Sequence, residues 1–346
     1  MAARFQRLRV LDVRRTTADA VVVTLEAFRA FIPGQYLTLR ATIDGQDVRR
    51  SYSICSGLDD GTLRVGIKHL PAGIFSTWAN TVLKTGDSLL AMPPEGRFGV
   101  PMNPPAPRVI AAFAAGSGIT PILSIMKTVL AREPASRFFL FFGNRATHDI
   151  MFRDEIEDLK DRYLSRLSVF HVLSRETQEL NILNGHLDPE KIPALARLMP
   201  PPDHALICGP QAMIEGLEPA LAAAVPRARI HVERFTPSLE IPRPPPVIVE
   251  GVPPATIATL ILDGARLEVP MAAGETIVEA ALRAGRDPPF SCRAGMCCTC
   301  RARLLEGRVE MAANYSLEPW ETQAGYVLTC QALALTDRVV VDFDQV

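Results

Sequence analysis

Four cysteines in the last quarter of the 346-residue chain have a spacing that suits metal chemistry. Cys292, Cys297 and Cys300 follow a C-x4-C-x2-C pattern, and Cys330 comes thirty residues later. Thiolates with this spacing are typical of sites that hold a [2Fe–2S] cluster. A loop with Gly295 at its middle can fold around a compact cluster, while a separate strand brings the fourth sulfur. The sequence therefore predicts Cys292, Cys297, Cys300 and Cys330 as the cluster ligands.

Zinc and disulfides are two alternative uses of these cysteines. A structural zinc site usually pairs two short hooks of the C-x2-C kind, and only Cys297 and Cys300 form such a hook. Disulfides require an oxidising compartment, but the chain has seven cysteines, an odd number, and its first residues lack the apolar stretch of a signal peptide. We therefore expect a cytoplasmic protein. Cys298 is interpreted as a bystander, because the spacing is complete without it.

Length and composition predict a globular protein of two or three domains, and 48% apolar residues are ample for their cores. The net charge of −1 gives no argument for binding nucleic acid or an anionic membrane. There is also no run of eighteen apolar residues that would suggest a membrane span. We expect no nucleic-acid partner and no membrane partner.

Residues 1–105 have the pattern of short strands separated by turns, which predicts a small antiparallel barrel. The expected strands are Arg7–Val13, Val21–Leu25, Tyr36–Arg40, Val48–Ile54 and Thr62–Ile67. Two polar motifs lie in this segment, Arg50-Ser51-Tyr52-Ser53 and, some twenty residues on, Gly73-Ile74-Phe75-Ser76. An arginine can neutralise a phosphate in bidentate fashion, and backbone N–H groups at a helix start can bind a pyrophosphate.

Residues 106–235 alternate apolar strands with helical stretches, as in a doubly wound parallel sheet. The turn Ala114-Ala115-Gly116-Ser117-Gly118-Ile119-Thr120-Pro121 joins the strand Val109–Phe113 to the helix Ile122–Leu130. Its glycines let the backbone approach a pyrophosphate at the positive end of a helix. The later strands are expected at Phe138–Phe142, Leu167–Leu173, Ala205–Ile207 and Ile230–Phe235, and a further helix at Ala212–Ala224.

Two of these strands end in polar residues. Gly143-Asn144-Arg145 ends the second strand, and Ser174-Arg175 ends the third. Open α/β sheets bind their ligands at the carboxyl ends of the strands. The sequence therefore predicts that these residues lie at a ligand-binding edge.

Residues 236–255 contain seven prolines, which predicts a semi-rigid linker. In the last ninety residues, a hairpin is expected from Thr256–Leu262 and Leu267–Val269, followed by a helix near Thr276–Ala284, the cysteine loop, and strands near Val327–Thr329 and Val339–Phe343. This order resembles a β-grasp ferredoxin domain of the plant type.

The two barrel motifs resemble the flavin site of the ferredoxin–NADP reductase family. The resemblance implies a bound FAD in preference to FMN, with Arg50 at a phosphate, Tyr52 beside the flavin or its ribityl chain, and Ser53 at the flavin edge. It also implies pyrophosphate binding by the backbone of Gly73, Ile74 and Ser76. Many relatives carry arginine at the position of Ile74, so that phosphate contacts there rest on the backbone alone.

The turn around Gly116, Gly118 and Thr120 is similar to the nicotinamide-dinucleotide loop of the same family, in which the threonine lies near the flavin. Cys208-Gly209-Pro210 resembles the motif whose thiol lies beside the nicotinamide ring, which implies that Cys208 positions the ring for hydride transfer. Ser174 and Arg175 resemble a pair that holds the 2′-phosphate of NADP. The resemblance thus implies NADPH as the electron donor, with NADH as the alternative.

The module order is a flavin barrel (1–105), a nucleotide domain (106–235), a linker (236–255) and a [2Fe–2S] ferredoxin domain (256–346). It resembles reductase components of bacterial multicomponent oxygenases, and the tail Asn314–Pro319 and Gly325–Ala332 resembles those of ring-epoxidising monooxygenases. This implies an oxidoreductase that passes electrons from NADPH through FAD and the cluster to the subunits of a di-iron oxygenase. A reductase for another ring hydroxylase or dioxygenase is the first alternative, and a non-catalytic redox sensor or scaffold is the second.

Overall fold

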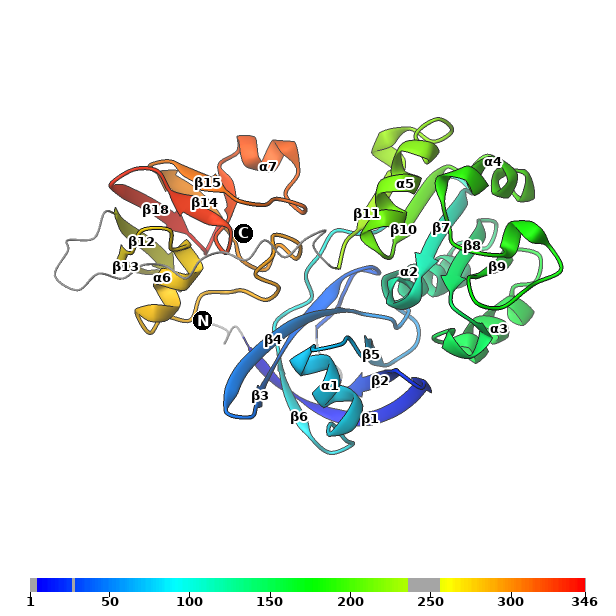
Figure 1. Cartoon of the computed structure of the whole chain (residues 1–346), viewed down its shortest axis with the longest axis horizontal. Coiled ribbons are helices and arrows are strands. Elements are labelled where there is room, and N and C mark those ends of the chain that lie inside the picture. Colours follow the sequence, from blue (N-terminus) through cyan, green and yellow to red (C-terminus); the bar gives the residue numbers. More distant parts are fainter. Residues whose placement is uncertain (1–4, 27–28, 236–255, 346) are drawn as a thin grey trace. The chain divides into compact units, whose positions relative to one another are not determined.

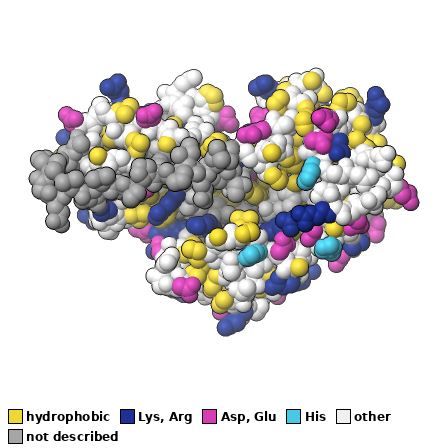
Figure 2. Space-filling model, viewed as in Figure 1, with side chains coloured by type: hydrophobic (Ala, Val, Ile, Leu, Met, Phe, Trp, Pro, Cys, Tyr) yellow, Lys and Arg dark blue, Asp and Glu magenta, His cyan; other side chains and the backbone are white. Residues whose placement is uncertain are grey.

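The computed structural model describes residues 5–26, 29–235 and 256–345. The chain divides into two compact units, of which the larger spans Phe5–Phe235 and the smaller holds the described residues from 256 onward (Figure 1). The predicted linker, residues 236–255, lies outside the described residues. No helix in the described part is both long enough and apolar enough to cross a membrane. Acidic and basic side chains are interspersed over the face shown in Figure 2, in keeping with the net charge of −1.

The first part of the larger unit is an antiparallel sheet of six strands in the order β4-β3-β6-β1-β2-β5. The strands are β1 (Gln6–Thr17), β2 (Ala20–Leu25), β3 (Tyr36–Ile43), β4 (Gln46–Ser53), β5 (Leu63–Lys68) and β6 (Ser88–Ala91). A bridge between Ile54 and Val65 brings the end of β4 back to β5. Helix α1 (Ile74–Thr81) packs Phe75 and Ala79 into the core of this sheet (Figure 1). The antiparallel flavin-domain fold is thus confirmed, although β6 was not predicted.

The second part is a sheet of five parallel strands in the order β11-β10-β7-β8-β9. The strands are β7 (Val109–Ala115), β8 (Arg137–Asn144), β9 (Leu167–Leu173), β10 (His204–Cys208) and β11 (Ile230–Glu233). Its helices are α2 (Ile119–Arg132), α3 (Arg153–Arg162), α4 (Ile192–Leu195) and α5 (Gln211–Leu221). Strand order and parallel pairing confirm the doubly wound sheet.

Side chains of β8 alternate between two cores, as those of a strand buried on both faces must. Phe138, Leu140 and Phe142 pack with residues of α2 and α3, whereas Phe139 and Phe141 pack with residues of α4 and α5. Helix α2 begins three residues earlier than predicted, because Pro121 falls in the first helical turn, where a missing N–H costs no hydrogen bond. The glycine turn is correspondingly short, with a 3₁₀ turn at Gly116–Gly118.

The sheet and the barrel share one core. Ala20, Val22 and Cys55 from the barrel are buried in the same cluster as Ile122 and Ile125 of α2. This common core holds the two parts together as a single unit. We refer to the turn at Gly116–Gly118 as the nucleotide turn. Its position relative to the barrel is therefore fixed by packing.

The smaller unit is built on a mixed sheet in the order β13-β12-β18-β14-β16, with a separate β15–β17 pair. The strands are β12 (Thr256–Leu262), β13 (Ala265–Met271), β14 (Arg301–Glu306), β15 (Val309–Met311), β16 (Tyr326–Leu328), β17 (Ala332–Ala334) and β18 (Arg338–Asp342). Helix α6 (Ile277–Arg283) begins with a capping box between Thr276 and Glu279, and α7 (Pro319–Gln323) is a short helix before β16. The α+β ferredoxin-type fold is confirmed, but β14, β15, β17 and α7 were not predicted.

Two stacked histidines on β10 and β11 predict a pH dependence of stability. His204 Nδ1 and His231 Nε2 lie 3.1 Å apart, and burial, reinforced by His204 and Arg108, lowers the pKa of His231 from 6.5 to about 4. Between these two pH values the unfolded chain binds a proton that the folded chain does not, so the stability falls as the pH is lowered. We expect His231→Gln to flatten the fall in Tm between pH 6.5 and pH 4. His148→Gln serves as the control, because that side chain is 79% exposed.

Candidate active site and cluster site

The cysteine loop connects α6 to β14, and Cys330 follows β16. Gly295 lies in the loop with φ +77°, and a Cβ added there would be only 2.9 Å from Ala313 O. A side chain at this position would therefore both strain the backbone and collide with the backbone of Ala313. The glycine lets the loop fold tightly against residues 313–316, where Tyr315 N and Ser316 Oγ donate hydrogen bonds to Gly295 O.

The four predicted sulfurs lie within interaction range of one another, with Cys292 paired with Cys297 and Cys300 paired with Cys330. The hydrogen bond from Cys297 lowers the pKa of Cys292 to about 7, and that from Cys300 lowers the pKa of Cys330. Two backbone or amide donors also point at these sulfurs, from Ala294 N at 3.4 Å and from Gln331 Nε2 at 3.5 Å. The same interactions, together with burial, raise the pKa values of Cys297 and Cys300, so one thiol of each pair is favoured as the thiolate, which is the form that binds metal.

Two sulfur pairs fit a two-iron cluster, in which each iron takes two protein thiolates. Among the described residues, no group of three or more His, Cys, Asp or Glu side chains is arranged so that it could hold a single metal ion. None of the seven cysteines forms a disulfide. Cys298, which follows Cys297 in the sequence, has φ +55° and is partly buried against the core that includes Cys300 and Cys330.

Arg50 is the cation of the first barrel motif. Its side chain is exposed, and its guanidinium donates to the carbonyl of Arg49 at 2.7 Å. The neighbouring Arg49 is buried and forms an ion pair with Asp47 at 2.9 Å. Of the two adjacent arginines, Arg50 is thus the one whose charge faces outward, as binding a phosphate requires.

Tyr52 brings the two barrel motifs together. Its ring lies 5.4 Å from that of Phe75 in α1, and burial raises its pKa, so the hydroxyl stays protonated. Ser53 is buried at the end of β4 and pairs with Tyr36 of β3. The structure therefore places Arg50, Tyr52 and Ser53 on the strand that faces the start of α1.

The start of α1 is closed by a hydrogen-bonded turn. The N–H of Gly73 already donates to Leu70 O at 2.9 Å, and the hydroxyl of Ser76 accepts from Leu70 N and donates to Gly73 O, both at 3.1 Å. The N–H of Gly73 is thus used within the turn, and the role of Gly73 at a pyrophosphate stays a prediction. The N–H groups of the first helical turn, from Ile74 onward, have no carbonyl partner within the helix, and the Ile74 side chain is 43% exposed.

The nucleotide turn packs backbone to backbone against the Cys-Gly-Pro loop. A Cβ added at Gly118 would lie 2.0 Å from Cys208 O, and one added at Gly209 would lie 3.2 Å from Ala115 N. The contact between the two loops therefore requires glycine at position 118, and it leaves only limited room for a side chain at Gly209. No local pattern indicates this contact, because the loops are ninety residues apart in the sequence.

Thr120 connects the turn to the barrel. Its hydroxyl donates to Ser117 O at 2.9 Å, and its methyl group would lie 2.7 Å from a Cβ added at Gly66 of β5. Thr120 therefore packs against β5 of the barrel, and its proximity to the flavin stays a prediction. Cys208 is fully buried, and burial raises its pKa well above the ordinary value. A protonated, buried thiol suits a positioning role and not that of a nucleophile.

The strand-end residues also meet. Ser174 N donates to Asn144 O at 3.0 Å and Arg175 N donates to Arg145 O at 2.7 Å, so the ends of β8 and β9 run side by side. Arg145 and Arg175 are both exposed. Two guanidinium groups on adjacent strand ends form a positive edge that suits a phosphate.

Three further polar residues at this edge were not among the predicted site residues. Both polar atoms of the Asn144 side chain, and Oε1 of Gln211, are buried without a partner in the part of the chain that the structure describes. Lys68 Nζ lies 4.0 Å from a Cβ added at Gly116. Buried polar atoms are nearly always satisfied in folded proteins, so the orphaned atoms fit a polar ligand such as a dinucleotide. Their position at strand and helix ends was the available signal.

Three family profiles match the chain, in the order of its domains. They are the oxidoreductase FAD-binding domain over residues 19–99, the oxidoreductase NAD-binding domain over 113–218 and the 2Fe-2S iron-sulfur cluster binding domain over 260–335. The chain belongs to the family of electron-transfer oxidoreductases that combine these three domains.

Individual relatives extend over nearly the whole chain. It is 43% identical to one of the subunits of 1,2-phenylacetyl-CoA epoxidase from Escherichia coli (strain K12), over 98% of both proteins. It is 33% identical to the ferredoxin reductase component of 3-ketosteroid-9-alpha-monooxygenase from Rhodococcus rhodochrous, over 95% of this chain and 92% of the relative. The solved structure of phthalate dioxygenase reductase has the same fold, with a TM-score of 0.63 and 22% identity over 98% of each chain.

Proposed function

We propose that this protein is an NADPH-dependent reductase that supplies electrons to a di-iron oxygenase, and that the oxygenase acts on phenylacetyl-CoA. The observation that carries the proposal is the end-to-end identity of 43% with an epoxidase subunit, in a chain whose four predicted cluster cysteines lie in two pairs. The seven cysteines without disulfides suit the reducing cytoplasm. We place the domain boundaries at 1–105, 106–235 and 256–346, which enclose the three matched segments.

When bound, FAD accepts a hydride from the nicotinamide nucleotide and the [2Fe–2S] cluster carries single electrons onward. Arg50 and the first-turn N–H groups of α1 neutralise the flavin phosphates, while Tyr52 and Ser53 hold its ring system. Thr120 and Cys208 position the nicotinamide from the two loops that meet at Gly118.

The positive edge formed by Arg145 and Arg175 predicts a preference for NADPH over NADH. Removing a hydrogen bond to a charged group costs about 1.5–3 kcal/mol, so Arg175→Ala should lower kcat/KM for NADPH by about 10- to 100-fold. The value for NADH should not change, because NADH lacks the 2′-phosphate. Arg162→Ala is the control, since this exposed arginine lies at the far end of α3. An unchanged preference in Arg175→Ala would remove Arg175 from this role.

Reconstitution tests the partner. The reductase, mixed with the oxygenase subunits of the epoxidase and phenylacetyl-CoA, is expected to support NADPH-dependent turnover. A specific observation favours the second candidate, a reductase for another ring oxygenase: the chain is also 33% identical to the reductase component of a steroid monooxygenase. Failure with the epoxidase subunits, in a preparation that reduces its own flavin and cluster with NADPH, would favour that candidate.

A further inference from the structure

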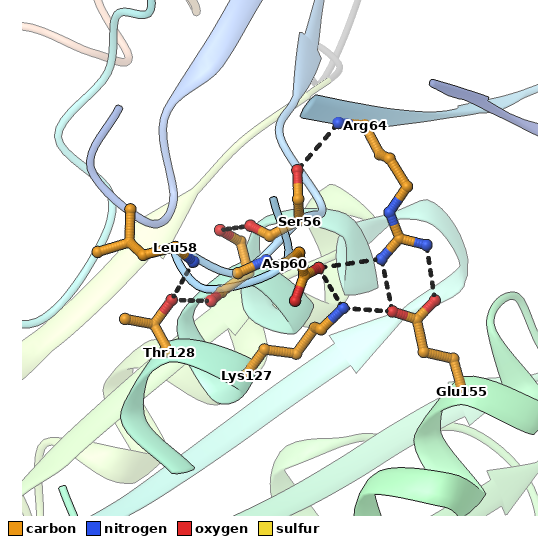
Figure 3. A network of polar contacts seen from close by, with 9 residues as sticks. Ser56, Leu58, Asp60, Arg64, Lys127, Thr128 and Glu155 are labelled. Atoms are coloured by element: carbon orange, nitrogen blue, oxygen red, sulfur yellow. Dashed lines mark hydrogen bonds and ion pairs between the residues drawn. The ribbon is translucent and has the colours of Figure 1, made fainter. Parts of the chain in front are cut away.

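Four charged residues form a network where the barrel meets the parallel sheet (Figure 3). We refer to Asp60, Arg64, Lys127 and Glu155 as the ionic cluster. Glu155 Oε1 accepts from Arg64 Nη2 and from Lys127 Nζ, both at 2.6 Å, and Glu155 Oε2 accepts from Arg64 Nη1 at 3.1 Å. Asp60 Oδ2 accepts from Lys127 Nζ, and from Arg64 Nη2 at 3.3 Å.

The ionic cluster is partly sheltered from water and has no net charge. Its side chains are 13–19% exposed, with two cations facing two carboxylates. Burial alone would raise the pKa of Glu155, but hydrogen bonds from Arg64 and Lys127 outweigh it and the pKa is lowered. Each carboxylate touches both cations, so removing any one member leaves a sheltered charge without its full set of partners.

Neutral hydrogen bonds flank the ionic cluster along α2. Ser124 Oγ donates to Ser56 O at 2.6 Å, and Thr128 Oγ1 accepts from Leu58 N at 3.2 Å (Figure 3). At Gly57, an added Cβ would lie 2.9 Å from the Cβ of Lys127. The buried face of α2 is thus held against the barrel loop that precedes β5.

The elements that carry the ionic cluster also carry the active site. Arg64 lies two residues before Gly66, on the same face of β5. Lys127 lies seven residues after Thr120, on the same face of α2. A Cβ added at Gly66 would lie 2.7 Å from the methyl group of Thr120 and 3.0 Å from the ring of Phe152. Phe152 is the N-cap residue of α3, the helix that holds Glu155. A shift of α2 along β5 at the ionic cluster would therefore move Thr120 past Gly66.

We propose that the ionic cluster is a positioning device for hydride transfer. It fixes α2 and α3 against β5, so that the nucleotide turn meets the flavin site in one register. Apolar contacts of the shared core resist separation of the two parts, but they are not directional. Charged hydrogen bonds with defined geometry resist sliding. The proposal rests on the proposed function, because it assigns these residues a role in the transfer from nucleotide to flavin.

The test is anaerobic rapid mixing of NADPH with the full-length holoprotein. The rate of flavin reduction is measured from the flavin absorbance over a range of NADPH concentrations. Glu155→Gln keeps the size of the side chain and removes its charge, and Lys127→Met keeps the length and removes the charge. A misplacement of 1 Å can cost about 10²-fold in rate, so we expect the limiting rate of flavin reduction to fall by about that factor. The dissociation constant for NADPH and the FAD content should stay as in the wild type. Lys127→Arg, which keeps the charge, should recover most of the rate.

Arg132→Gln is the matched control. Arg132 lies on the same helix and pairs with Asp59 of the same loop at 2.7 Å, but the two side chains are 46% and 50% exposed. Exposed pairs contribute little, so the rate should stay within about fivefold of the wild type. The proposal is overturned if Glu155→Gln and Lys127→Met keep the wild-type rate of flavin reduction, whether or not their Tm falls. It is also overturned if both variants lose FAD, because the role of the ionic cluster would then be structural. Wild-type flavin that neither NADPH nor NADH reduces would instead refute the proposed function.

Discussion

Cys297→Ser is expected to abolish electron delivery to cytochrome c, while NADPH still reduces the flavin. Serine is a poor metal ligand at neutral pH because its hydroxyl stays protonated, and the substitution also breaks the sulfur pair with Cys292. The rate of cytochrome c reduction should fall by more than the roughly 10- to 100-fold that is typical when a residue hydrogen-bonded to a metal ligand is replaced. The measurements are the rate of cytochrome c reduction and an anaerobic visible spectrum with iron and sulfide assays, before and after one equivalent of NADPH.

Cys298→Ser is the control for this change, since Cys298 lies next to Cys297 in the same loop and belongs to neither sulfur pair. It should keep its iron, its sulfide and the reduction of cytochrome c. Loss of flavin reduction in Cys297→Ser would contradict a modular electron path, and zinc in place of iron in the wild type would contradict the cluster itself.

The fold could be predicted from the sequence where one pattern dominates a segment. The apolar run Phe138–Phe142 followed by polar residues identified a buried parallel strand, and it is buried on both faces. Short elements such as β15 and α7 escaped prediction because three to five residues carry no clear periodicity. Helix α7 is instead held by a tertiary ion pair between the fully buried Glu321 and Arg301.

The candidate site was predictable where a short motif supplies a whole binding element, as at Cys292–Cys300. It was not predictable where the geometry joins distant segments. Asn144 was visible only as the end of a strand, and its orphaned amide depends on what surrounds it. The ionic cluster joins residues 60, 64, 127 and 155, of which only Asp60 and Arg64 are close in the sequence. Nothing local distinguishes these four residues from ordinary surface charges.

Gly118→Ala is expected to disable NADPH-dependent flavin reduction without removing FAD. The added Cβ would lie 2.0 Å from Cys208 O, a backbone atom at the end of a buried strand, so one of the two loops must move. Overpacking of this kind costs about 1–3 kcal/mol in stability, and a displacement of about 1 Å at the site costs on the order of 10²-fold in rate. The readouts are the rate of anaerobic flavin reduction by NADPH and the FAD content of the purified protein.

Gly209→Ala separates the effect of position from that of an added methyl group. The nearest atom to a Cβ at Gly209 is the end of the flexible Met213 side chain, at 2.5 Å, and the nearest backbone atom is farther, at 3.2 Å. Methionine can adopt another rotamer, so this variant should retain much more of the rate than Gly118→Ala. Equal losses in the two variants would mean that the loops tolerate no added volume at all. A wild-type rate in Gly118→Ala would show that the contact between the nucleotide turn and the Cys208 loop does not control hydride transfer.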